Sequence, residues 1–228
     1  MRKFLVSLVL LAAVLVVADR IGAVIAGREI ASRIQAAYNL PSKPAVSVRG
    51  IPFLTQVASG NYHEIDVSVA SLSASGVRVD GLTARLTGVR APLSDLSGRN
   101  SASITAAQIS GTGTVPFSSV RGHLPRGVQL SQDGGALRLS GTVTYLGTSV
   151  PASADASLSA TGTGIAVTPT RVSVASGSSA LSSVISGQFR FVIPVTGLPL
   201  HLSLNAVTVV PGGVQVSASA ANVAFTGH

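Results

Sequence analysis

Apolar and polar residues alternate along most of the chain from residue 45 onward, and this alternation limits the possible folds more than any other feature. A period of two is typical of β-strands that bury one face. The sequences DGG at 133–135 and PGG at 211–213 separate such segments, and glycine tolerates the positive φ that hairpin turns require. The alternating segments are 46–49, 65–70, 77–86, 128–130, 137–145, 189–193, 200–204 and 214–218. We therefore expect a mostly antiparallel sheet.

A helix is expected before the sheet, over residues 19–38. Its apolar residues follow the three-four spacing of an amphipathic helix, and Asn39 and Pro41 end it. Packing on the sheet is the favoured interpretation, and lying on a membrane surface is the alternative. Two short segments, 116–124 and 178–186, also favour helix because Pro or Ser stands near their starts. The expected fold class is α+β, with an N-terminal amphipathic helix packed along one long, curved, mostly antiparallel sheet.

The first 18 residues form a separate segment. Arg2 and Lys3 precede an apolar run of 15 residues, Phe4–Ala18, and small residues stand where a signal peptidase cleaves. A spanning helix needs about 20 apolar residues, so the run is short for an anchor. Apolar residues resume at Ile21, however, so an uncleaved membrane anchor is the alternative to a cleaved signal peptide. We expect export to the periplasm or cell envelope, with 1–18 as signal peptide or membrane anchor and 19–228 as one domain.

Composition and charge narrow the possible partners. Charged residues make up 11% of the chain and the formal net charge is +8. The arginines are dispersed along the sequence, which disfavours nucleic acid and is compatible with an anionic lipid or membrane surface. There is no Cys, and the four histidines lack the short spacings of zinc sites. We expect no metal and no cofactor.

Catalytic motifs are missing from the sequence. No G-x-S-x-G elbow occurs, and the glycine sequences at 111–113 and 162–167 lack the lysine of a phosphate-binding loop. A Ser–His–Asp triad assembled from distant residues remains an open alternative, since triads are defined by geometry. The expected protein is not an enzyme.

One segment, VSVRGIPFLTQVASGNYHEIDVSV at 46–69, carries a recognisable pattern. It joins a strand, a turn of sequence Gly-x-Pro-Phe-Leu-Thr-Gln, a further glycine and an alternating strand. This segment resembles the LmeA-like phospholipid-binding family, exported proteins of mycobacteria and their actinobacterial relatives. The segments 88–96 and 207–225 look like later parts of the same family. The motif residues are Gly50, Pro52, Phe53, Leu54, Thr55, Gln56 and Gly60.

The resemblance implies binding of phospholipid, phosphoinositides among them, in the cell envelope. It also implies a role in making lipoglycans such as lipomannan, with an envelope glycosyltransferase as a possible partner, and a fold similar to tubular lipid-binding (TULIP-like) proteins. No catalytic residues follow from it. The rival interpretation is an envelope scaffold whose sheet is fully self-packed and which binds a membrane enzyme.

Two sets of candidate site residues follow. An apolar side chain offers contact to acyl chains, and Phe53 as a simple core residue is the alternative to that role. Arginine pairs bidentately with phosphate, although a solvated surface arginine is equally compatible with each position. The apolar candidates are Ile51, Pro52, Phe53, Leu54, Phe117, Phe189, Phe191, Leu200 and Leu202. The headgroup candidates are Arg49, Thr55, Gln56, Arg121 and Arg126, of which Thr55 and Gln56 alternatively cap the turn.

Overall fold

The computed structural model describes residues 2–74, 77–92, 104–124, 127–145, 148–161, 164–174, 179–194, 200 and 202–225. By their internal contacts the residues divide into two compact units. Unit 1 comprises Met1–Ser71, Thr83–Gly111 and Ala220–His228, and unit 2 comprises Leu72–Leu82 and Thr112–Ser219. The assignment of 19–228 to one lipid-binding domain stays a prediction.

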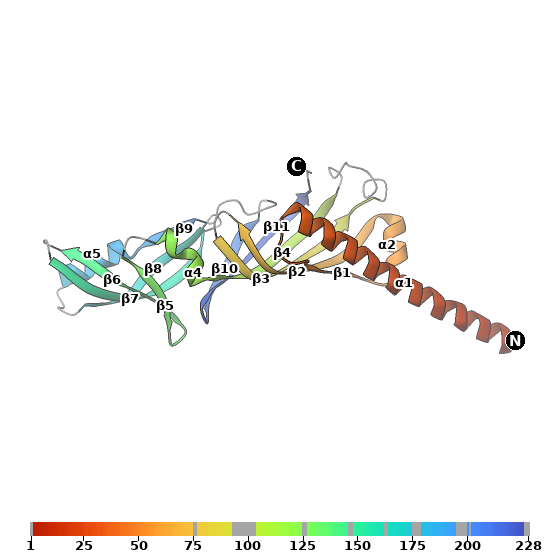
Figure 1. Ribbon diagram of the computed structural model, residues 1–228, viewed down its shortest axis with the longest axis horizontal. Coiled ribbons are helices and arrows are strands. Elements are labelled where there is room, and N and C mark those ends of the chain that lie inside the picture. The colour runs from red at the N-terminus through yellow and green to blue at the C-terminus, as the bar shows by residue number, and fades with distance from the viewer. Residues whose placement is uncertain are drawn as a thin grey trace. The chain divides into compact units, whose positions relative to one another are not determined.

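Helix α1 (Arg2–Ala37) runs without a break through the apolar run and the expected amphipathic segment. Figure 1 shows its N-terminal half extending free of the strands of unit 1. Its C-terminal half lies against β1 (Ala45–Arg49), and its buried positions recur every four residues. A four-residue spacing places side chains on one face of a helix. The buried positions are Asp19, Ala23, Gly27 and Ala31. The predicted packing of this helix on a sheet is confirmed.

The segment expected to be a turn before a strand contains a helix, α2 (Phe53–Ser59). Pro52 precedes it with φ −76°, and Gly60 follows it in the left-handed region with φ 66°. Glycine adopts this conformation without strain, so it ends the helix and returns the chain to a strand. The prediction of a turn alone was wrong because the group that caps α2, Asp19, comes from α1.

The strands form two sheets, where the sequence pattern indicated one. The first has the order β1-β2-β3-β4-β11-β10 and the second the order β5-β6-β7-β8-β9. The described registers are antiparallel, and the hairpins predicted at 133–135 and 211–213 are confirmed as β5–β6 and β10–β11. The remaining strands of the first sheet are β2 (Asn61–Ala74), β3 (Val77–Arg90), β4 (Thr105–Pro116), β10 (Ser203–Val210) and β11 (Gly213–Ala224). Those of the second are β5 (Gln129–Asp133), β6 (Ala136–Tyr145), β7 (Thr148–Ala160), β8 (Gly164–Val174) and β9 (Phe191–Pro194). The predicted α+β class is confirmed.

Unit 2 has its own apolar core, built from strands and short helices. The predicted helical segments are confirmed as α4 (Phe117–Val120) with the 3₁₀ turn η1 (Arg121–His123), and as α5 (Ser179–Gln188). Several of the predicted strand positions lie outside strands. Phe189 follows α5 and is buried in the core, while Leu200 and Leu202 precede β10, and Leu200 has φ 61°.

Candidate functional site

A groove of about 540 Å³ lies between α1 and β1 in unit 1. At 1.5 Å per residue, its helical wall from Arg20 to Ala31 is about 16 Å long. Its floor and walls are mostly apolar, and cationic side chains stand along it. Its lining residues are Arg20, Ala23, Val24, Gly27, Arg28, Ala31, Lys43, Pro44, Ala45, Val46, Ser47 and Val48. Its volume falls in the range of about 300–1,000 Å³ that is usual for ligand pockets.

Small residues of α1 explain how helix and strand come together at the groove. A Cβ atom at Gly27 would lie 2.6 Å from the carbonyl oxygen of Val46, so only glycine permits this approach. Ala23 and Ala31, one turn to either side, are buried at the same interface. The helix and strand therefore touch through backbone and methyl groups.

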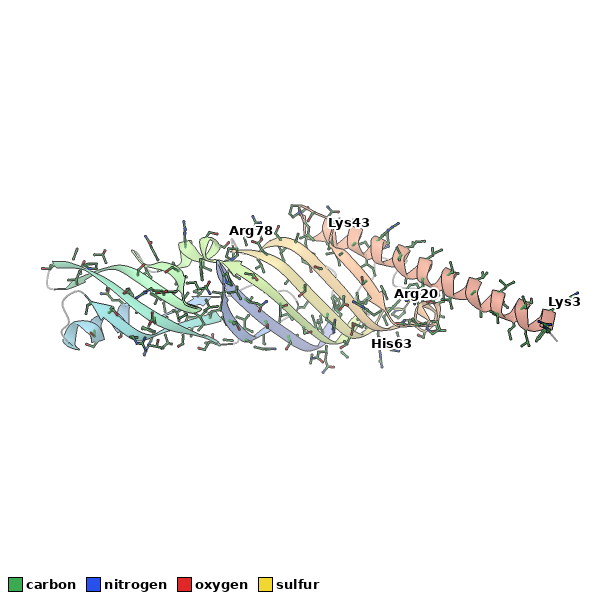
Figure 2. All side chains as sticks on the ribbon, turned by 90° about the horizontal axis from the view of Figure 1, so that it is seen from below. Lys3, Arg20, Lys43, His63 and Arg78 are labelled. Atoms are coloured by element: carbon green, nitrogen blue, oxygen red, sulfur yellow. The ribbon has the colours of Figure 1, made fainter. Side chains whose placement is uncertain are left out.

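The groove carries positive charge. No acidic residue is among those that line it. Arg20 pairs with Asp19, with Nη2 and Oδ2 2.5 Å apart, whereas Arg28 and Lys43 have no ion-pair partner within the described residues. Figure 2 shows Arg20 at the level of α2 and Lys43 near the opposite end of the C-terminal half of α1. A cationic groove with apolar walls is suited to a ligand that is both anionic and greasy.

Asp19 fixes one end of the groove by joining α1 to α2. Asp19 is 5% exposed, and its carboxylate accepts a hydrogen bond from the backbone N–H of Leu54 at 2.8 Å. Arg20 in turn donates to the carbonyl oxygen of Gly50 at 3.0 Å. The N–H of Phe53, the guanidinium of Arg20 and the N–H of Leu54 together lower the pKa of Asp19 to about 2. The carboxylate is therefore ionised at neutral pH and caps the N-terminus of α2.

A second hollow of about 650 Å³ lies elsewhere in unit 1, at the ends of β2, β3, β4 and β11. Arg90 and His63 contribute its basic groups. Burial raises the pKa of Tyr62, so its phenol stays neutral and is available as a hydrogen-bond donor. The other residues that line this hollow are Asn61, Gly88, Val89, Thr105, Ala106, Ala107 and Asn222. This hollow is the alternative to the α1–β1 groove as a site for a polar headgroup.

The predicted residues from the Pro-Phe motif occupy contrasting environments. Phe53 is buried and its ring lies beside Gly22 of α1. The centroid of this ring lies 6.4 Å from that of Tyr62. Ile51, Pro52 and Leu54 are exposed. Phe53 therefore packs into the core of unit 1, and its role in lipid contact stays a prediction together with that of its neighbours.

The polar candidates of the same motif make local hydrogen bonds. Gln56 is 2% exposed; its Oε1 accepts from the N–H of His63 at 3.0 Å, and its Nε2 donates to the carbonyl oxygen of Pro52. The Thr55 hydroxyl also donates to the Pro52 oxygen. These bonds stabilise α2 and its junction with β2. Contact of either side chain with a headgroup stays a prediction.

Of the predicted arginines, Arg49 belongs to unit 1 and Arg121 to unit 2. Arg49 donates to Asp66 at 2.8 Å, and Arg85 binds the other carboxylate oxygen at 2.9 Å. Burial alone raises the pKa of Asp66, but Arg85 and Arg49 outweigh it and hold that pKa below its usual value. Arg121 is exposed in unit 2, and Arg126 lies outside the described residues.

The other apolar candidates belong to unit 2. Phe189 is buried in its core, and Phe117 and Phe191 are half-buried against the same core. Leu200 and Leu202 are also half-buried. The structure thus divides the predicted apolar set between the two units, and the part in unit 2 stays a prediction.

Sequence reasoning missed the α1–β1 groove. A signal was present, because the small or buried residues of α1 recur every four positions at 19, 23, 27 and 31. Arg28 and Lys43 were not chosen because they lie outside the motif, one on a helix and one in a loop. Both residues line the same groove because β1 packs along α1.

Comparison with known proteins yields one match. The model of a protein family described as LmeA-like phospholipid-binding matches residues 17–219. This span contains every residue that lines the α1–β1 groove. No curated protein and no solved structure matches the chain significantly.

Proposed function

Since the chain belongs to the LmeA-like phospholipid-binding family, we propose that it holds a phospholipid in the groove between α1 and β1. The observation that carries this proposal is the combination of apolar walls with the cations Arg28 and Lys43, which have no ion-pair partner among the described residues. The proposed activity is binding without a chemical step.

Each part of a phospholipid has a matching surface in this groove. An acyl chain lies along the helical wall, where the exposed side chain of Val24 offers apolar contact. Each methylene group removed from water contributes about 0.8 kcal/mol, so a chain is held without specific polar contacts. The phosphate lies with Arg28 or Lys43, whose charge-assisted hydrogen bonds are the stronger kind. A lipid with extra phosphates, such as a phosphoinositide, gains most from this charge.

The finer parts of the function rest on family resemblance alone. We include transfer of the lipid between membranes, export to the cell envelope and support of lipoglycan maturation in the proposal. An apolar groove at the surface of unit 1 is compatible with release as well as with storage. A glycosyltransferase partner belongs to the same proposal.

Native mass spectrometry of the full chain in a mild detergent tests the binding, with phosphatidylinositol and phosphatidylcholine added in turn. We expect one phosphatidylinositol per chain. The double variant Arg28→Gln/Lys43→Gln should bind it at least about tenfold more weakly, equivalent to about 1.4 kcal/mol. Arg90→Gln, which removes a cation from the second hollow, is the matched control and should bind normally.

A second pair of variants tests the apolar wall. Val24 lines the groove and is 52% exposed, whereas its neighbour Ile25 is 59% exposed and does not line it. Val24→Asp should abolish binding and Ile25→Asp should not. If only Arg90→Gln lost binding, the headgroup would have to be assigned to the second hollow. A wild-type chain that binds neither lipid would overturn the proposal and favour the scaffold interpretation.

A further inference from the structure

The exposed apolar run of α1 is too short to cross a membrane without help. Among the described helices, α1 alone is long and apolar enough to be a candidate span. Its run Phe4–Ala18 rises about 22 Å, whereas the hydrocarbon core of a bilayer is about 30 Å thick. The helix continues past Ala18, and Ile21, Val24 and Ile25 remain 52–59% exposed. Residues 19–25 add about 10 Å of helix and carry exposed apolar side chains on into the interfacial region of the bilayer.

The same part of α1 has two exposed apolar neighbours from another segment. Ile51 is 73% exposed and Leu54 is 47% exposed. The Cδ2 atom of Leu54 lies 3.9 Å from where a Cβ of Gly22 would be, so this side chain lies beside the helix at that level. We call Ile51 and Leu54 the α2 corner. Among the described residues of unit 1, no large hydrophobic side chain outside α1 and Tyr38 is exposed except these two.

The charges at this level are arranged so that they do not oppose lipid contact. Asp19 is buried against α2, where its carboxylate binds the N–H of Leu54 and the guanidinium of Arg20. Arg20 remains partly exposed, and its long side chain can extend toward phosphate groups at a membrane surface. A buried carboxylate that is ion-paired with a partly exposed arginine is compatible with the boundary between hydrocarbon and headgroups.

We propose that the α2 corner is a membrane-contact surface whose partner is a phospholipid bilayer. Helix α1 crosses the bilayer with Phe4–Ala18, and Ile51 and Leu54 lie at the interface beside residues 21–25, where they widen the apolar surface of the helix. The continuity of exposed apolar surface from α1 to the α2 corner, with Arg20 beside it, carries this inference. The Arg20 end of the groove then opens at the bilayer surface, and lipid enters it laterally. The entry route rests on the proposed function, whereas the membrane contact does not.

The chain has no native Cys, so single cysteines can carry a fluorophore without background. The full chain is reconstituted into vesicles of phosphatidylcholine and phosphatidylglycerol that contain lipids with a nitroxide near the glycerol or deep in the acyl chain. Probes at Ile51→Cys and Leu54→Cys should be quenched severalfold more by the shallow nitroxide. A probe at Val14→Cys should be quenched by the deep one. Probes at the exposed polar positions Ser32→Cys and Asn61→Cys should be unaffected.

Two results would overturn the membrane contact. One is quenching at positions 51 and 54 no greater than at Asn61, with Val14 quenched. The other is recovery, in the membrane-free fraction of producing cells, of a chain that begins at Asp19. Quenching at 51 and 54 in a chain that binds no phospholipid in detergent would support the contact while removing the proposed function.

The entry route has its own variant. Ile51→Ser/Leu54→Ser changes two exposed side chains and leaves the packed residues of α2 intact. Loading of the groove from vesicles should slow severalfold, while affinity in detergent stays unchanged. Loading at the wild-type rate would overturn the entry route.

Discussion

Replacing Gly27 with alanine is expected to destabilise the protein, whereas the same replacement at Gly22 of α1 is expected to stabilise it. In a helix interior, glycine to alanine gains about 1 kcal/mol. At Gly22 the new methyl group would lie 3.4 Å from the ring of Phe53, an ordinary contact, so the gain remains. At Gly27 it would lie 2.6 Å from a backbone oxygen of Val46, which cannot rotate away. Overpacking of this kind costs about 1–3 kcal/mol, so the two variants should differ by about that amount.

Thermal unfolding of the full chain in detergent micelles, followed by far-ultraviolet circular dichroism, measures the difference. For a chain of this size 1 kcal/mol shifts the midpoint by about 2–4 °C, so Gly27→Ala should melt about 2–12 °C below Gly22→Ala. Hydrogen exchange should also accelerate in β1 for Gly27→Ala alone. If Gly27→Ala melts at or above the temperature of Gly22→Ala, α1 does not pack on β1 through its backbone, and the groove as described is wrong.

Three further variants test the surroundings of the site. The pKa of Asp19 is lowered to about 2, below its ordinary value of 3.8. Its stabilising contribution is therefore present above about pH 4 and is lost as the pH falls toward 2. In Asp19→Asn the melting temperature should decrease less between about pH 4 and pH 2 than it does in the wild type. Gly50 has φ 101°, and a Cβ there would lie 2.7 Å from Nε2 of Gln56, so Gly50→Ala should lower the free energy of unfolding by about 1–3 kcal/mol in urea titrations. Asp66→Asn should change that free energy by less than about 1 kcal/mol, since its arginine partners are exposed, and a larger loss would show that this ion-pair cluster stabilises the sheet.

The parts of the fold that depend on local pattern were predictable. Periodicity of two located most strands, and Gly-Gly sequences located the hairpins β5–β6 and β10–β11. Strands β4, β7 and β8 were missed, and in β7 the reason is that the inward positions are small. Ala152, Ala154 and Ala156 fill the core of unit 2 with side chains that give little hydrophobic contrast to the serines between them.

The site was less predictable because long-range contacts define it. The motif around Pro52 was recognised, but α2 depends on a cap from Asp19, 35 residues away. Gln56 was chosen for a headgroup because it is polar, yet it is buried and bonded to the chain at His63. Arg28 gave no local signal, since an arginine on an amphipathic helix is usually only solvated. Arg28 and Lys43 line the same groove only because α1 packs on β1, and that contact cannot be read from the local sequence.

The position of α1 also bears on self-association. Strand β1 is the outermost strand of its sheet, and an outermost strand has unpaired backbone groups on which a second chain can add a strand. Helix α1 lies against this strand, with Gly27 close to the backbone of Val46. The helix therefore protects the β1 edge of the sheet from pairing with another copy of the protein. A chain that has lost α1 should form oligomers through β1, so truncation at this end should lower solubility.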